Sequence, residues 1–271
     1  MLTADKKSLV EAVARQYEAI RDFTATVDMV PALGSAEKNS ITEYKDVRAY
    51  ILFRKPADIR IIGLMPVVRN KAFDMVSDSR NFKLYIPSRN RFLIGKNELT
   101  TPSKNKIENL RPQHFLEALI VAPVDPAAGD RLLLENLTDE DTAAYLLHLV
   151  RNDSNGGLRI VRTIWFNRVN LQIARQIIFD EQGNILTDAR YSDWRVYDGV
   201  AFPRHVDINR PHDEYAVVIT VVKMDINKGL SDDKFRLDQP EGSTLQNVGE
   251  GAPPAPAPAK KETRPRGTRK K

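Results

Sequence analysis

The sequence predicts a mainly β fold of the α+β class, built on one large, strongly curved antiparallel sheet. Short apolar segments bounded by turn residues recur along the chain and account for about 11 to 13 strands. Apolar residues at helical spacing occur in two longer segments, near 5–21 and 107–120. The 271 residues are enough to bury a sizeable core, and all-β folds of this length often form one domain.

The N-terminal segment predicts a helix followed directly by a strand. Thr3 or Asp5 can cap a helix that ends near Arg21. Its apolar residues at helical spacing are Leu9, Val10, Val13, Tyr17 and Ile20. Residues 23–30 then alternate, with Phe23, Ala25, Val27 and Met29 on one face. Residues 31–42 are expected to be a polar connection.

Residues 47–95 predict five short strands, with more apolar residues on both faces than a simple sandwich needs. Pro56 separates the second strand of the sheet from the third, because proline has no N–H to donate to a neighbouring strand. Residues 87–90 predict a hairpin turn. A sheet this apolar must be shielded from water by other parts of the protein or by a ligand. No group of catalytic side chains occurs among these residues. These residues therefore point to a protein that holds an apolar ligand.

The second half of the chain predicts further strands in a meander. Strands are expected at 132–134, 145–150, 158–166, 171–179, 185–196, 200–209 and 215–226. Asp198-Gly199 is the strongest two-residue hairpin signal in the chain. Residues 228–235 are expected to close the domain with a single helical turn.

The formal net charge of +5 comes from the C-terminus. Residues 252–271 contain seven Lys and Arg against one Glu, so they carry +6 and the other residues carry −1. We expect a folded domain at 1–245 and a disordered Pro/Ala-rich basic tail at 246–271. The domain is not expected to bind nucleic acid. The tail is interpreted as a solvated spacer, or alternatively as a contact for anionic surfaces.

Composition and motif spacing argue against most enzyme classes. The chain has no cysteine, which excludes disulfides, zinc–thiolate sites and thiol catalysis within it. The four histidines lack metal-ligand spacing, and no G-x-S-x-G nucleophile elbow is present. We therefore expect no catalytic residue, no metal and no cofactor. The first residues lack the features of a signal peptide, and we expect that a leader has been removed.

Five segments together resemble a known family. They are F-x-A-x-V at 23–27, LFRKPADIRI at 52–61, AFDMVSDSRNFKLYIPSRNRF at 72–92, IIFDEQGNI at 177–185 and VVKMDINKGLSDDKFRLDQPEG at 221–242. Their order and spacing are similar to the LolA/LolB-like lipoprotein-carrier superfamily, including its uncharacterised lipoprotein-sorting relatives. The resemblance covers about residues 5–242.

The resemblance implies a fold, a function and a location. It implies an incomplete, curved antiparallel β-barrel of about 11 strands with a helical lid, acting as a monomer. The cavity would take acyl chains of lipids or lipoproteins in the bacterial periplasm or at the inner face of the outer membrane. An anchoring cysteine would then lie upstream of residue 1. Family carriers have an Arg just before the strand-breaking proline that contacts the lid, and Lys55 occupies that place here.

Candidate ligand-binding residues follow from alternation along the strands and the second helix. They are Val27, Met29, Ile51, Phe53, Ile61, Met75, Leu84, Ile86, Phe92, Phe115, Leu116 and Leu119. Ordinary core packing is the alternative for each of them. A single β-bulge would exchange the two faces of a strand.

Three hypotheses remain open at this point. The first is a carrier or binder of lipid or lipoprotein acyl chains. The second is a structural or sensory envelope lipoprotein that recognises protein partners on the same scaffold. The third is a hydrolase using the region of His205 and Asp213, although residues 209–214 are expected to be a solvated hairpin loop. A continuous apolar cavity beneath 107–120 would favour the first, a filled core with an exposed apolar patch the second, and a cleft at His205 the third.

Overall fold

The computed structural model describes residues 1–35, 40–43, 46–66, 69–97, 111–138, 142–153 and 156–248. Within these residues the helices are α1 (Lys6–Glu18) and α2 (Pro112–Leu119), with 3₁₀ turns η1 (Pro87–Arg89), η3 (Pro126–Ala128) and η4 (Asp232–Phe235). The strands are β1 (Asp22–Ser35), β2 (Ser40–Glu43), β3 (Val47–Arg54), β4 (Asp58–Leu64), β5 (Lys71–Ser77), β6 (Asn81–Ile86), β7 (Arg91–Lys96), β8 (Arg131–Thr138), β9 (Ala143–Asn152), β10 (Leu158–Asn167), β11 (Ile173–Phe179), β12 (Ile185–Tyr197), β13 (Val200–Arg210), β14 (Tyr215–Ile226) and β15 (Thr244–Val248).

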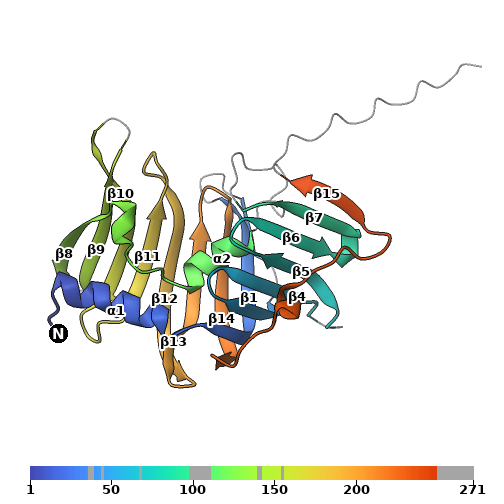
Figure 1. Ribbon diagram of the computed structural model, residues 1–271, viewed down its shortest axis with the longest axis horizontal. Coiled ribbons are helices and arrows are strands. Elements are labelled where there is room, and N and C mark those ends of the chain that lie inside the picture. Colours follow the sequence, from blue (N-terminus) through green and yellow to red (C-terminus); the bar gives the residue numbers. More distant parts are fainter. Residues whose placement is uncertain are drawn as a thin grey trace, which may run out of the picture.

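All the described strands belong to one open sheet. Fourteen of its 15 strands follow the order β15-β7-β6-β5-β4-β3-β1-β14-β13-β12-β11-β10-β9-β8, and β2 pairs with β1 off this path. Strand β15 runs parallel to β7, and the other pairs are antiparallel. The strand direction turns steadily from β8 to β15 (Figure 1), as expected where strand twist accumulates over many strands. The sheet does not close into a barrel.

The mainly β prediction is confirmed, but the expected number of strands was too low. Strands β2 and β15 were missed. The expectation of a polar connection over 31–42 was wrong, because β1 continues to Ser35 and pairs with β2 in residues 40–43. The sequence there contains Pro31 and Gly34, which are poor strand formers. Pairing with both β14 and β2 outweighs that local preference.

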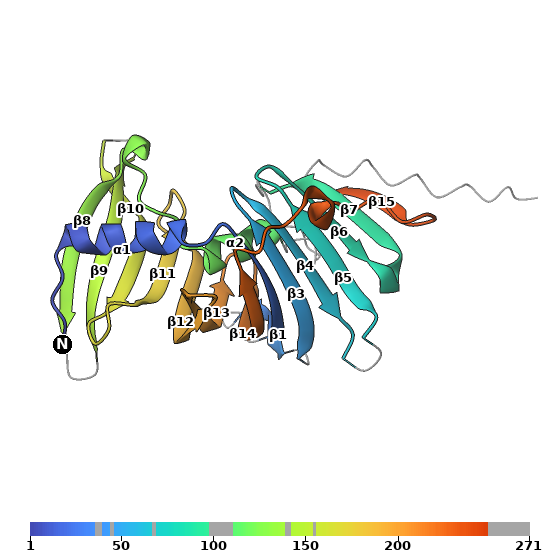
Figure 2. The ribbon, with the colours of Figure 1, turned by 60° about the horizontal axis from the view of Figure 1, so that its bottom comes forward.

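Both helices pack on the same side of the sheet, which we call the inner face; the opposite side is the outer face (Figure 2). Helix α1 crosses the strands from β8 to β13. Lys6 Nζ at its start is 3.4 Å from the Leu132 carbonyl, and Gln16 Nε2 near its end donates to the Ala201 carbonyl at 3.0 Å. Helix α2 lies over the centre, in contact with β4 and β5 on one side and β12 and β13 on the other.

The helix ends follow the chemistry of their first residues. The Asp5 carboxylate accepts a hydrogen bond from the Ser8 N–H at 2.8 Å and caps α1. Helix α2 begins with Pro112 at its first position, where the missing proline N–H has no intrahelical partner to lose. The predicted start at 107 cannot be compared, since Ile107 and Leu110 lie outside the described residues.

The predicted hairpin at Asp198-Gly199 is confirmed. The two residues have φ angles of 48° and 82°, and they connect β12 to β13. Two consecutive positive φ angles are typical of the tight turn whose twist matches antiparallel strands. Glycine at the second position removes the steric cost of that conformation.

Residues 228–243, which we call the C-terminal strap, run across the outer face of β3 to β6. Arg54 donates to the Leu230 carbonyl at 2.9 Å, Arg60 to the Lys234 carbonyl at 2.9 Å, and Lys83 to the Leu237 carbonyl at 3.1 Å. The strap includes η4, the single helical turn expected near 228–235. Strand β15 then continues to Val248, past the expected domain boundary at 245.

Candidate ligand-binding site

Most of the predicted ligand-binding residues lie together on the inner face. One buried apolar cluster, which also includes residues of α1, contains Val27, Met29, Ile51, Phe53, Ile61, Met75, Leu84, Ile86, Phe115, Leu116 and Leu119. The strands therefore present the expected face to the two helices. Contact of these residues with a ligand remains a prediction.

Phe92 does not belong to this set, and its prediction was wrong. It packs with Val76 and Leu237 on the outer face, beneath the C-terminal strap. Directly paired residues share a face of a sheet, and the residue paired with Leu84 is Leu93. The turn between β6 and β7 sets this register, so alternation counted through the turn gave the wrong side.

The inner face above β1 and β3 to β6 is filled by side chains. Val27, Ile61 and Met75 are at most 2% exposed. Space opens farther along, where α1, α2 and strands β10 and β11 meet, in a cavity of about 160 Å³. Its apolar wall includes Tyr17, Phe53, Leu116, Ile120 and Ile178, and its polar wall includes Gln113, Glu117, Arg162 and Gln176. We call this the interhelix cavity.

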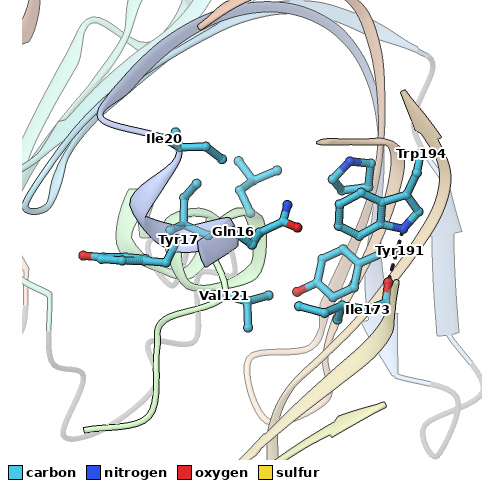
Figure 3. A pocket seen from close by; sticks show the side chains of 10 residues that line it. Gln16, Tyr17, Ile20, Val121, Ile173, Tyr191 and Trp194 are labelled. Atoms are coloured by element: carbon cyan, nitrogen blue, oxygen red, sulfur yellow. Dashed lines mark hydrogen bonds between the residues drawn. The ribbon is translucent and has the colours of Figure 1, made fainter. Parts of the chain in front are cut away.

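A second, much smaller space lies beneath the end of α1 (Figure 3). It measures about 20 Å³, enough for roughly one water molecule. The Tyr191 hydroxyl donates to the Ala118 carbonyl at 2.7 Å, and the Trp194 indole N–H donates to the Ile173 carbonyl at 3.2 Å. Burial raises the pKa of Tyr191, so this hydroxyl remains protonated. The space is too small for an acyl chain.

An open cleft of about 530 Å³ lies next to residues 122–123. Ala122, Arg162 and Ile178 line both this cleft and the interhelix cavity. Arg162 holds the segment between the two spaces, because its guanidinium donates to the Ala122 carbonyl at 2.7 Å and to the Pro123 carbonyl at 3.3 Å. Partial burial lowers the pKa of Arg162 to about 10, so the group is a cation at neutral pH.

Lys55, the expected lid contact, binds the end of α1 rather than α2. Its Nζ donates to the Tyr17 carbonyl at 2.6 Å and lies 3.8 Å from the centroid of the Tyr17 ring. Burial lowers the pKa of Lys55. Because Tyr17 lines the interhelix cavity, Lys55 fixes one wall of that cavity.

Helix α2 is held at its N-terminal end by a buried polar cluster. His114 Nδ1 is 2.9 Å from the Tyr215 hydroxyl, and the Arg210 guanidinium donates to the Asp213 carboxylate at 2.6 Å and to the Thr187 hydroxyl at 2.6 Å. The prediction of a solvated loop at 209–214 was wrong for Arg210 and Asp213, which are 6% and 3% exposed. Their charges turn inward because they neutralise each other beneath the helix.

This cluster does not include His205, on which the hydrolase hypothesis depended. His205 Nδ1 lies 3.2 Å from the Thr220 hydroxyl. Its neighbour Val206 packs in the inner cluster, so His205 points to the outer face while Asp213 is bonded to Arg210. The structure therefore does not bring His205 and Asp213 together. In the part of the chain that the structure describes, no three His, Asp or Glu side chains are grouped as metal ligands.

Sequence reasoning missed the polar wall of the interhelix cavity. Strand β10 has a register shift between Ile160 and Arg162, and β11 has one next to Ile178. A bulge of this kind changes which side chains point inward. Arg162 and Gln176 are polar in the sequence, but β10 and β11 also contain other polar residues such as Arg159 and Arg175, so polarity alone did not single out the two that line the cavity. No helix among the described residues has the length and apolar character needed to cross a membrane.

Comparisons with known proteins show the fold. No family model matches the sequence, and no curated protein matches it. A LolA superfamily protein from Nitrosomonas europaea superposes with a TM-score of 0.54 at 15% identity, covering 87% of this chain and 99% of that one. A putative outer membrane lipoprotein-sorting protein domain from Vibrio parahaemolyticus gives 0.54 at 12% identity, covering 84% and 94%.

A third solved structure extends this comparison. A DUF1329 family protein from Desulfovibrio piger gives a TM-score of 0.55 at 16% identity, covering 86% of this chain and 98% of that one. The chain thus has a LolA-like fold along most of its length. The resemblance seen in the sequence is confirmed for the fold.

Proposed function

We propose that this protein is a non-catalytic binder or carrier of lipid or lipoprotein acyl chains in the bacterial cell envelope. The observation that carries the proposal is the interhelix cavity, which lies between α1, α2 and the sheet, is partly open to solvent and has an apolar wall. The lipoprotein-sorting domain that shares the fold supports the same class of function and a cell-envelope location. A monomer is sufficient for this role, since one chain supplies every wall.

The sizes of the two spaces indicate how a chain would fit. An apolar cavity of about 150 Å³ holds a molecule as small as benzene, so the interhelix cavity alone takes only part of an acyl chain. The cleft beyond residues 120–123 offers about 530 Å³ more. A chain that passes Arg162 and Ile178 would occupy both spaces. Each methylene buried there contributes about 0.8 kcal/mol.

Native mass spectrometry of the purified protein with a diacylated phospholipid tests this proposal. Ile178→Trp fills the wall shared by the two spaces and should reduce the adduct at least about tenfold, because overpacking excludes the chain. Val196→Trp is the matched control, since Val196 is 71% exposed on β12. Absence of an adduct with the unmodified protein, or equal adducts with both variants, would reject the cavity as the site.

One observation favours a second candidate, a structural or sensory envelope protein that recognises another protein. Leu133, Leu158 and Ile160 are 61%, 61% and 40% exposed on β8 and β10, while much of the inner face is filled. Large apolar side chains left exposed on a surface are a feature of partner-binding sites. This second function is supported if no lipid binds to the protein, if an envelope protein co-purifies with it, and if Leu133→Lys abolishes that co-purification.

A further inference from the structure

Arg162 carries a positive charge into the wall shared by the interhelix cavity and the open cleft. Its hydrogen bonds to described residues go to two neutral acceptors, the carbonyl oxygens of Ala122 and Pro123. The carboxylate that stabilises its charge most is Asp130, and that carboxylate is already bonded to Arg151. Partial burial of a cation is costly unless an anion lies against it. The guanidinium of Arg162 is therefore suited to an anion supplied by a ligand.

Two further arginines line the same cleft from β9 and β10. Arg159 on β10 is paired directly with Arg151 on β9, so both side chains lie on one face of the sheet. Arg151 is bonded to Asp130, whereas Arg159 has no hydrogen bond or ion pair to a described residue. Like charges in directly paired positions destabilise a sheet. An anion bound between these guanidinium groups would offset that repulsion.

The other carboxylates of the cleft do not neutralise Arg159 or Arg162. Asp125 and Asp180 accept hydrogen bonds from backbone N–H groups of their own turns, and Glu181 is exposed. Salt in the solvent screens exposed charges beyond about 8–10 Å. A direct bond between a guanidinium and an anion is stronger than this screened repulsion, because donor and acceptor are both charged.

We propose that Arg159 and Arg162 bind an anionic head group, a phosphate or a carboxylate, whose alkyl or acyl chain extends into the interhelix cavity. Arg162 lines both spaces, so it lies where the chain ends and the head group begins. A guanidinium presents N–H donors in a planar fork that matches two oxygens of such a group. The inference rests on the proposed function and specifies the head group of its ligand.

Two ligands with the same alkyl chain test the proposal. Dodecyl phosphate and 1-dodecanol differ in the phosphate group, and both can displace a fluorescent acyl probe. The unmodified protein should bind dodecyl phosphate at least about tenfold more tightly, as expected for a hydrogen bond between charged groups. Arg159→Met should lose most of this preference and bind 1-dodecanol as before, because Arg159 holds no described part of the chain. Arg89→Met, on the exposed turn η1, is the matched control and should keep the preference.

Inorganic phosphate separates a head-group site from a site for the free ion. At the concentration of dodecyl phosphate that displaces the probe, inorganic phosphate should leave the probe bound, because it has no chain to place in the cavity. Displacement of the probe by inorganic phosphate would overturn the proposal, since the anion would then bind without the chain.

The remaining outcomes distinguish the head group from the acyl site. Equal affinities for the two ligands in the unmodified protein, or a preference unchanged in Arg159→Met, would overturn the inference and leave acyl binding intact. Binding of neither ligand would remove the proposed function together with the inference. If Arg159→Met does not fold, salt takes its place: the preference should fall several-fold between about 0.05 and about 0.5 M sodium chloride, and a preference independent of salt would count against the proposal.

Discussion

Lys55 joins strand β3 to the last turn of helix α1 through Tyr17. The lysine Nζ is 2.6 Å from the Tyr17 carbonyl and 3.8 Å from the centroid of its ring. A cation at this place also interacts favourably with the negative end of the helix dipole. Tyr17 and Phe53 both line the interhelix cavity, so a single side chain connects two of its walls.

Replacing Lys55 by Met should loosen the end of α1. The variant loses the bond to the Tyr17 carbonyl and the cation–π contact, together worth about 1–2 kcal/mol of unfolding free energy. Hydrogen–deuterium exchange should rise in residues 13–19 and remain unchanged in β13 and β14. Lys7→Met is the matched control, since the Lys7 side chain is 84% exposed on the same helix. Equal exchange in both variants would show that α1 is held by its apolar face alone.

His114 should make the protein less stable at mildly acid pH. Burial, with Arg210 and Arg111 nearby, lowers the pKa of His114 well below 6.5 in the folded protein. Below about pH 6.5 the unfolded chain therefore takes up a proton that the folded chain does not. The free energy of unfolding should fall as the pH falls, by up to about 2 kcal/mol between pH 6.5 and 5.

Urea unfolding at pH 7 and 5 tests this dependence. His114→Gln should show a smaller loss of stability between the two pH values than the unmodified protein. Asp213, beside the histidine, and Glu117, whose pKa burial raises, are present in both proteins, so the difference isolates His114. His212→Gln is the control, because the His212 side chain is 52% exposed. An identical pH dependence in all three proteins would exclude His114 as the cause.

Leu237 should stabilise the fold through the outer face. It is 7% exposed and packs on Phe92 and Val76 beneath the C-terminal strap. Leu237→Ala should lower the free energy of unfolding by about 2–3 kcal/mol, because it leaves a space next to Phe92. Leu245→Ala changes the same atoms at a position 50% exposed and should cost less than about 0.5 kcal/mol. Similar losses in both variants, measured by urea unfolding, would contradict the outer-face core.

The sequence predicted the strands well where alternation is unbroken. Val27, Ile51 and Ile61 face inward as expected, since β1, β3 and β4 keep a period of two through this stretch. Phe92 failed because the register across the β6–β7 turn, rather than alternation alone, decides its face. Local pattern therefore gives the faces within a strand, and turn geometry gives them between strands.

The polar residues of the site could not be predicted from the sequence of each strand taken alone. Arg162 follows a bulge in β10, and Arg210 and Asp213 are buried because α2 covers them. Both effects depend on contacts between residues far apart in the sequence. Polar composition alone gives the opposite expectation, as it did for residues 209–214. The fold class could thus be predicted from the sequence, whereas the place of the cavity required the packing of both helices.

Arg162 should control whether the interhelix cavity and the open cleft of about 530 Å³ are separate. Its guanidinium donates to the carbonyls of Ala122 and Pro123, and its side chain lines both spaces. Arg162→Met keeps most of the apolar stem but removes both bonds, so residues 120–125 should become more mobile. Hydrogen–deuterium exchange of this segment should rise at least about fivefold, which corresponds to the loss of roughly one hydrogen bond's net stability.

The neighbouring Arg159 provides the control for this change. It lines the cleft but not the interhelix cavity, and Arg159→Met should leave exchange in residues 120–125 unchanged. A fluorescent acyl probe should also enter Arg162→Met faster than the unmodified protein, because the segment next to the two spaces opens more often. If exchange and entry are unchanged in Arg162→Met, residues 120–123 are held by Ile120 and Val121 in the core, and the arginine only lines the wall.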